Sequence, residues 1–262
     1  MKYVYAKMSR CGLCNKLCTW AQAELCAKHL GGRMIAPDFE QLPSVWALIR
    51  GEHELRTNRG DFEIPKDNYV TGFRKLRVLA VERHRVITFS GLGHGTFEKV
   101  LEDHDYIVQR LWNMTSAGVR ARVAADSADP YIGVHIRRGD FRVAGFALAD
   151  EWYVRAIKEA HGIATSCTCV RVFSDENASR LDFLKRALPD LRVIVQTCST
   201  PLTDLWLLSR SQAMVGTSGS SFSIWATIIG QMPSVWHPNK APRSDELYVD
   251  SVADDVRRVV MM

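Results

Sequence analysis

An apolar run that ends in two adjacent arginines constrains the fold of this chain more than any other feature. Tyr131–Ile136 is rich in β-branched residues and follows the turn signal Asp129-Pro130, so it predicts a buried strand. Arg137 and Arg138 follow at once. Open α/β sheets bind ligands beyond the carboxyl ends of their strands, and guanidinium groups match phosphate oxygens. The segment therefore predicts a diphosphate site, unless both arginines form a structural network with Asp140 and an acidic helix.

The pattern that follows this strand is a regular alternation. Further strands are predicted at Cys169–Phe173, Arg192–Val195 and Ala213–Val215. Helices are predicted between and after them, at Glu151–Ala160, Ala178–Ala187, Thr203–Ser209 and beyond Ser220. This order is typical of a doubly wound parallel sheet. The polar stretch Asp126–Pro130 predicts a domain boundary, which gives domains of residues 1–126 and 127–262.

The N-terminal half begins in the same way but then loses its pattern. A short strand is expected at Tyr3–Ala6, and a loop at Ser9–Asn15 leads into a helix with apolar residues at four-residue spacing, which Gly31-Gly32 ends. Arg33–Pro37 resembles a second short strand. Pro43–Gly95 is irregular and is interpreted as an acceptor-side region, and Thr96–Val123 is expected to be helical.

Composition narrows the functional classes. The chain has 262 residues, 47% of them hydrophobic, and a net charge of +5 without a basic tail, so nucleic-acid binding is not the first expectation. No apolar run approaches the ~18 residues that span a bilayer, and Met1–Ala6 leads into Lys7 and Arg10 rather than a signal-peptide core. Seven cysteines in no secreted framework agree with a reducing compartment. We expect a cytoplasmic protein without an integral membrane segment, for which a loose membrane association stays open.

Two further segments are predicted at the ligand-facing edge of the sheet. Asp175 and Glu176 end the second strand of this half and can accept hydrogen bonds from a nucleobase or ribose, although capping the next helix is as good an explanation. Gly216–Ser223 connects a strand to a helix and would gather backbone amides at the positive end of the helix dipole. Such turns also serve as plain connectors, and no Lys-Ser/Thr follows as in a Walker loop.

Metal and hydrolase chemistry find little support. Asp103-His104-Asp105 has the D-x-D form of metal-dependent glycosyltransferases but lies in a charged, helical stretch rather than at a strand end. Cys11, Cys14 and Cys18 suggest a metal site, with Cys26 or His29 as a fourth ligand, but a second pair is missing and packing explains them better. No G-x-S-x-G elbow is present. We expect no metal.

Taken in order, the motifs resemble the fucosyltransferase superfamily that shares H-x-R-R-x-D, and most closely its bacterial α-1,2-fucosyltransferase branch. Six segments of this chain are each similar to a motif of that family. Gly12–Leu17 is similar to a G-L-G-N-Q-L loop, Val134–Phe141 to the segment V-H-I-R-R-G-D-Y, and Trp152–Ile157 to a helix that carries a tyrosine. Phe173–Glu176 is similar to the segment F-S-D-D, Asp204–Ser209 to a helix with acidic and aromatic residues, and Ser220–Trp225 to the segment N-S-S-F-S-W-W. The departures are Cys14 and Lys16 for Gly and Gln, Phe141 for Tyr, and Gly219 for Asn.

The resemblance implies a GT-B-like α/β protein with two Rossmann-type domains facing across a cleft. Residues 1–126 would form the acceptor-side domain and residues 127–262 the GDP-sugar-binding domain. The implied reaction is metal-independent, inverting transfer of fucose from GDP-fucose to a glycan, most simply in an α-1,2 linkage to galactose. A different nucleotide-sugar donor, or a non-catalytic nucleotide- or nucleic-acid-binding protein, remains the alternative.

The same resemblance, with the charge that develops on departing GDP, suggests roles for individual residues. Arg137 would stabilise the leaving group, Arg138 would assist it or fix the loop, and Asp140 would orient both arginines or cap the turn. Donors to the phosphates would come from Ser218, Gly219, Ser220, Ser221 and Phe222. Asp175 and Glu176 would face the guanine or ribose, His135 would line the cleft, and Asn15 would approach from the opposite domain. The general base is unresolved, with Asp150 and Glu151 as weak candidates.

Overall fold

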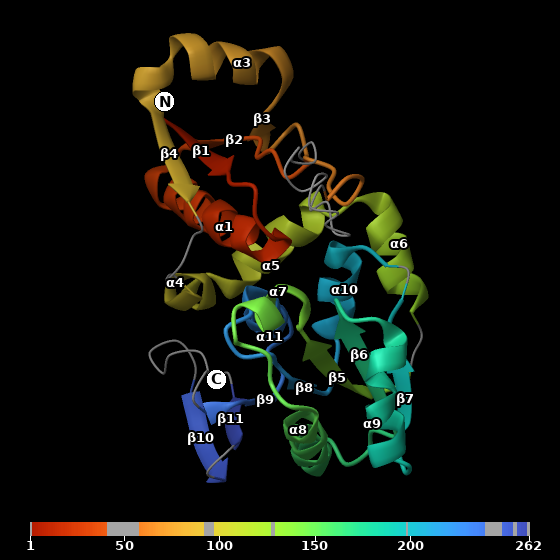
Figure 1. Ribbon diagram of the computed structural model, residues 1–262. Helices are drawn as coiled ribbons and strands as arrows, with labels where there is room; N and C mark the ends of the chain where they lie inside the picture. The colour runs from red at the N-terminus through yellow and green to blue at the C-terminus, as the bar shows by residue number, and fades with distance from the viewer. Residues whose placement is uncertain are drawn as a thin grey trace. The chain divides into compact units, whose positions relative to one another are not determined.

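The computed structural model describes residues 2–40, 58–91, 97–126, 129–197, 199–238, 248–253 and 256–260. Of these, Asp140, Val143 and the last two stretches are described by their backbone alone. The chain forms two compact units, Met1–Arg122 (unit 1) and Val123–Met262 (unit 2), which are described separately below (Figure 1).

Unit 1 is built on a parallel sheet with the strand order β3-β2-β1-β4. Its elements are β1 (Tyr3–Met8), α1 (Leu13–Leu30), β2 (Arg33–Ile35), β3 (Tyr69–Val70), α3 (Gly72–Val81), the 3-10 turn η1 (Arg83–Arg85), β4 (Val86–Gly91), α4 (Phe97–Glu102), α5 (His104–Met114) and α6 (Ala117–Ala125), the last of which runs into unit 2. Gly31 ends α1 with a φ of 58°, a left-handed conformation that glycine adopts without steric cost.

Unit 2 holds a seven-stranded sheet with the order β10-β11-β9-β8-β5-β6-β7. Its elements are β5 (Tyr131–Ile136), α7 (Gly139–Val143), α8 (Asp150–Ile163), β6 (Cys169–Ser174), the 3-10 turn η2 (Ala178–Leu181), α9 (Asp182–Ala187), β7 (Arg192–Val195), α10 (Pro201–Leu208), β8 (Ala213–Val215), α11 (Ser221–Gly230), β9 (Ser234–Trp236), β10 (Tyr248–Ala253) and β11 (Val256–Val260). The strands β9, β8, β5, β6 and β7 are parallel, whereas β10 and β11 are antiparallel additions.

The strand order places a switch point beside β5. From β5 the chain moves outward through β6 to β7, then returns to add β8 and β9 on the other side of β5. The connections after β5 and β8 therefore leave the sheet in opposite directions, which opens a crevice at their carboxyl ends. The arginines follow β5 and the Gly/Ser turn follows β8, so both lie where this topology binds ligands.

Helices cover both faces of this sheet. Alternate residues of β5, among them Ile132 and Val134, pack against the buried residues of α8 and α9. On the other face, Gly133 approaches Leu208 of α10 so closely that an added Cβ would lie 2.7 Å from its Cδ1 atom. The sheet is thus doubly wound, and the predicted α/β class is confirmed.

Several expected boundaries shift, and some elements were missed. The helix predicted at Thr96–Val123 is three helices over its described part, and the one at Ala178–Ala187 begins with the 3-10 turn η2. Residues 58–91 were unassigned in the sequence but contain β3, α3, η1 and β4. Residues 43–57 and 92–95 of the region interpreted as acceptor-side lie outside the described residues. None of the described helices is long and apolar enough to cross a membrane.

Candidate functional site

The loops after β5 and β8 are joined through the hydroxyl group of Thr217. Its Oγ1 atom donates to the His135 carbonyl at 2.6 Å and accepts from the backbone N–H of Arg137 at 3.1 Å. The hydroxyl of Tyr153, on α8, lies 2.9 Å from the same atom. Thr217 and Tyr153 are fully buried. These contacts hold the backbone of Arg137 at the switch point.

His135 is buried beneath this junction and is neutral. Its Nδ1 atom lies 2.8 Å from Ser223 Oγ, which also accepts the N–H of Thr217 at 3.1 Å, and its ring stacks on Phe222 at 4.8 Å. Burial, with a smaller contribution from the charge of Arg137, lowers the pKa of His135 to about 3. Since Ser223 can donate its own proton to Nδ1, the imidazole proton is free to sit on Nε2.

The Gly/Ser turn after β8 brings one unpaired hydroxyl group to the start of α11. Ser220 is the residue before α11, is 2% exposed, and its Oγ atom has no hydrogen-bond partner in the described part of the chain. Ser218, by contrast, bonds the backbone of His237. Gly219 has a φ of 76°, which glycine and asparagine tolerate best, so it suits the position where the resembling family has Asn. Ser221 and Phe222 are half-buried in the first turn.

The two arginines have different surroundings. Arg138 is 5% exposed, and its guanidinium group lies 5.6 Å from the ring centre of Tyr153 and 5.5 Å from that of Phe183. It also forms an ion pair with Asp150, the first residue of α8. Arg137 is only half-buried, with its guanidinium group 5.2 Å from the ring centre of Phe141. The structural network considered as the alternative thus exists for Arg138 through Asp150 of the acidic helix α8, whereas the side chain of Asp140 lies outside the described part.

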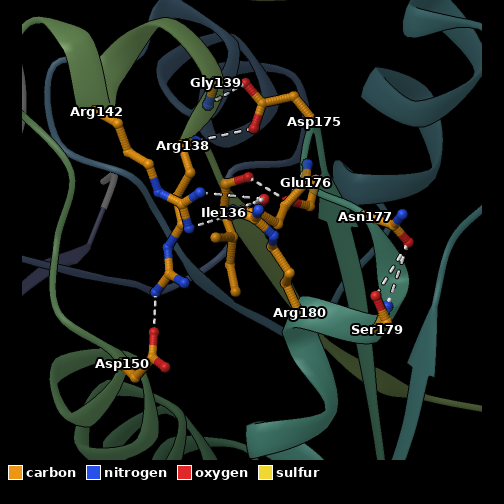
Figure 2. A network of polar contacts seen from close by, with 11 residues as sticks. Ile136, Arg138, Gly139, Arg142, Asp150, Asp175, Glu176, Asn177, Ser179 and Arg180 are labelled. Carbon is orange, nitrogen blue, oxygen red and sulfur yellow. Dashed lines mark hydrogen bonds and ion pairs between the residues drawn. The ribbon is translucent and has the colours of Figure 1, made fainter.

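The two acidic residues after β6 also differ. Both carboxylate oxygens of the exposed Asp175 accept backbone N–H groups, from Arg138 at 2.8 Å and from Gly139 at 3.0 Å. Figure 2 shows Asp175 and Asp150 on opposite sides of Arg138. Glu176 pairs with Arg142 at 2.5 Å and with Arg180 at 3.6 Å. Asp175 therefore fixes the turn that follows Arg137. Each of its two carboxylate oxygens has a further lone pair that can accept a hydrogen bond from a ligand.

The remaining predicted residues are Asn15 in unit 1, Asp140 in α7, and the two candidate bases at the start of α8. Asn15 is half-buried in the first turn of α1, in unit 1. Asp140 lies in α7 and its side chain is outside the described part. Of the two candidate bases, Asp150 is engaged by Arg138, whereas Glu151 is exposed in the first turn of α8.

The two motifs that suggested metals have the following surroundings. Asp103 pairs with Lys28 and, at 3.5 Å, with His29, while Cys11, Cys14 and Cys18 are buried and form no disulfide bond. Within the described ranges, no group of three or more His, Cys, Asp or Glu side chains is arranged to hold a metal ion.

Sequence reasoning missed Thr217 and Ser223 as site residues, and it noted Tyr153 only as part of a motif. Each hydroxyl group resembles many others in the chain. The available signal was position, because Thr217 follows β8 and Ser223 lies in the first turn of α11, the segments that the switch-point rule singles out.

Acid is expected to destabilise the protein through His135. Its pKa is about 3 in the folded chain. The unfolded chain, with a pKa of ~6.5, takes up a proton that the folded one lacks, so the free energy of unfolding falls as the pH drops below ~6.5 and this loss ends near the folded pKa. The contribution of His135 to the slope of the free energy of unfolding against pH should approach ~1.4 kcal/mol per pH unit, which denaturant unfolding between about pH 7 and 5 would measure.

The His135→Gln variant should show a shallower slope, and a variant of the exposed His84, His84→Gln, should keep the wild-type slope. Equal slopes for the wild type and His135→Gln would contradict the neutral, buried histidine.

Comparison with known proteins supports this fold and identifies the family. The family model described as glycosyl transferase family 11 matches residues 61–250. Similar solved structures include POFUT1 in complex with GDP-fucose, at 15% identity and a TM-score of 0.58 over 90% of this chain and 97% of that one. The α-1,6-fucosyltransferase NodZ soaked with GDP-fucose matches at 16% identity and a TM-score of 0.55 over 99% of both chains. NodZ from Bradyrhizobium, in a further structure, covers 92% of this chain and 96% of its own at the same identity and TM-score.

No curated protein matches significantly. The structural likenesses show the GT-B fold of two fucosyltransferases, as the sequence motifs predicted, and the family match covers most of the chain. The chain belongs to glycosyl transferase family 11 and is a glycosyltransferase.

Proposed function

We propose that the chain transfers fucose from GDP-fucose to a hydroxyl group of a glycan. One observation supports this most strongly: at the switch point between β5 and β8, a half-buried arginine and the N-terminus of α11 with its unpaired Ser220 hydroxyl belong to two loops that Thr217 joins. Arginine, helix-end amides and a free hydroxyl are the donors that a diphosphate requires.

The proposed chemistry follows from where charge develops. When the bond between the sugar carbon and the phosphate oxygen breaks, the electron pair stays on GDP, and the guanidinium group of Arg137 together with the α11 amides would stabilise it. Because Thr217 and Asp175 hold the backbone on either side of Arg137, these donors are oriented before the substrate arrives. The neutral His135 beneath them adds no charge of its own.

The donor is proposed from resemblance and from the comparisons together. POFUT1 and NodZ are described with GDP-fucose, and the motifs at Val134–Phe141 and Phe173–Glu176 resemble those of fucosyltransferases. Inversion, metal independence, an α-1,2 linkage to galactose, acceptor binding by unit 1 with Asn15 near the reaction centre, and a cytoplasmic location remain predictions.

The first test compares nucleotides by thermal shift. GDP should raise the melting temperature, whereas UDP and CMP should not, since a ligand that binds only the folded state stabilises it in proportion to its affinity. GDP-fucose with galactose-terminated oligosaccharides should then release GDP. Stabilisation by UDP instead would indicate a different donor, and GDP binding without release for any galactose or glucosamine acceptor would indicate a non-catalytic protein.

A variant of Ser220 tests the proposed diphosphate site most directly, in the same thermal-shift measurement of GDP binding. Ser220→Ala should weaken GDP binding by roughly tenfold, the value of about one hydrogen bond to a charged group, without lowering the melting temperature, because this hydroxyl has no partner in the described chain. The matched control is Ser223→Ala, which removes a hydroxyl that bonds both His135 and Thr217 and should lower the melting temperature. A Ser220→Ala variant that binds GDP like the wild type would place the diphosphate elsewhere.

A further inference from the structure

One side of helix α3 in unit 1 packs against the sheet. Val78 is 1% exposed and packs with Tyr3, Ile35 and Val70. Lys75 lies next to this side and donates to the carbonyl oxygen of Ala36 at 2.8 Å. Since Tyr3 points to α3, the alternate residue Val4 points to the other face, and Figure 1 shows α1 on the far side of the strands from α3.

The other side of α3 presents large apolar residues to the surroundings. On that side Phe73 and Leu76 are 83% and 63% exposed, and Val81, the last residue of the helix, is 71% exposed. At 3.6 residues per turn, Phe73, Leu76 and Ala80 lie opposite the packed side. Six large hydrophobic residues are exposed in the described part of the chain, and three of them belong to this one helix. Single exposed residues need no explanation, but a concentration on one helix marks a binding surface.

Positive charge surrounds these apolar residues. Arg74 and Arg77 are exposed on α3, and Arg83 is exposed in the turn η1 that follows. None of the three has an ion-pair partner among the residues that the structure describes. The neighbouring acidic groups are engaged elsewhere, since Asp38 pairs with Lys75 at 2.5 Å and Glu82 pairs with Arg85 at 3.1 Å.

We propose that the outer side of α3 binds the surface of a bilayer that contains anionic phospholipids. Apolar residues between unpaired arginines are the pattern of a helix that lies in the interface, with its hydrophobic side chains in the acyl boundary and its cations at the head groups. A second copy of the chain fits this surface poorly, because pairing α3 with itself would bring the unpaired arginines of both copies together. This surface is separate from the proposed donor site, which lies in unit 2.

The test is co-sedimentation of the full chain with vesicles. The wild type should bind phosphatidylcholine vesicles that contain phosphatidylglycerol, bind pure phosphatidylcholine vesicles much less, and lose binding as salt rises. Arg74→Gln with Arg77→Gln should weaken binding roughly 30-fold, since each cation near an anionic surface contributes about fivefold. Phe73→Ser with Leu76→Ser should also remove binding.

The matched control removes two exposed cations from unit 2, with Lys158→Gln and Arg186→Gln, and should bind vesicles within a few-fold of the wild type. Unchanged melting temperatures would show that the α3 variants remain folded. Three results would overturn the proposal: no binding by the wild type, equal losses in the α3 and control variants, or a wild-type dimer that Phe73→Ser converts to a monomer.

Discussion

Replacement of Arg137 by alanine is expected to abolish glycosyl transfer while leaving the fold intact. Removing one group that stabilises a developing negative charge typically costs 10²–10³ in rate, and an arginine that faces a diphosphate costs about 10³ or more. Arg137 is half-buried, and its ring contact with Phe141 contributes about 1 kcal/mol, so loss of this contact should lower the melting temperature by about 3 °C. The measurements are GDP release under saturating donor and a thermal melt.

The Arg137→Lys variant separates charge from geometry. A lysine keeps the positive charge but offers a single ammonium group in place of the planar fork, so we expect a rate reduced on the order of 10²-fold. Arg180→Lys is the control, because Arg180 is exposed on η2 and contacts only Glu176 among the interactions described above, at 3.6 Å. Near wild-type transfer by Arg137→Ala would refute the proposed role of this residue.

The location of the candidate site was predictable from the sequence. The run Tyr131–Ile136 has a β-branched residue at every second position, and Ala213–Val215 is a short apolar run before glycine, so both strands have the predicted bounds. Once the alternation of strands and helices is recognised, the topology brings the segments that follow them to one edge.

The different surroundings of the arginines were not predictable. Asp150 lies twelve residues beyond Arg138, at the start of α8, and only the packing of that helix on the sheet brings its carboxylate to the guanidinium group. The contacts of Thr217 depend in the same way on tertiary packing, since its partners His135 and Tyr153 are distant in the sequence.

Helix α3 was missed for a physical reason. Only Val78 is buried in it, and its largest apolar side chains point away from the core, so its apolar period does not mark a buried face. The strand β3 has two residues, too few for an alternating pattern. Both elements form because their neighbours in unit 1 hold them, not because their own composition demands it.

Arg138 should behave in the opposite way to Arg137, with stability as the main loss. Its buried side chain fills the space between Tyr153 and Phe183 and neutralises Asp150. Arg138→Ala creates a cavity and breaks this ion pair, which should cost about 2–4 kcal/mol and lower the melting temperature by roughly 5–10 °C. Transfer should fall by only about tenfold, because the backbone N–H bonds to Asp175 and Thr217 still hold the loop.

Variants of Asp150 and Arg138 test whether packing or the ion pair accounts for most of the stability that Arg138 contributes. The Asp150 side chain is 44% exposed, so water solvates its charge when the arginine is lost. Asp150→Asn instead leaves the buried guanidinium group of Arg138 without its carboxylate partner and should cost about 1–3 kcal/mol. Arg138→Met, which keeps the packing without the charge, should then retain more stability than Arg138→Ala. If Arg138→Ala instead melted like the wild type and lost all transfer, its guanidinium group would have to contact the departing diphosphate, and the different roles assigned to the two arginines would be wrong.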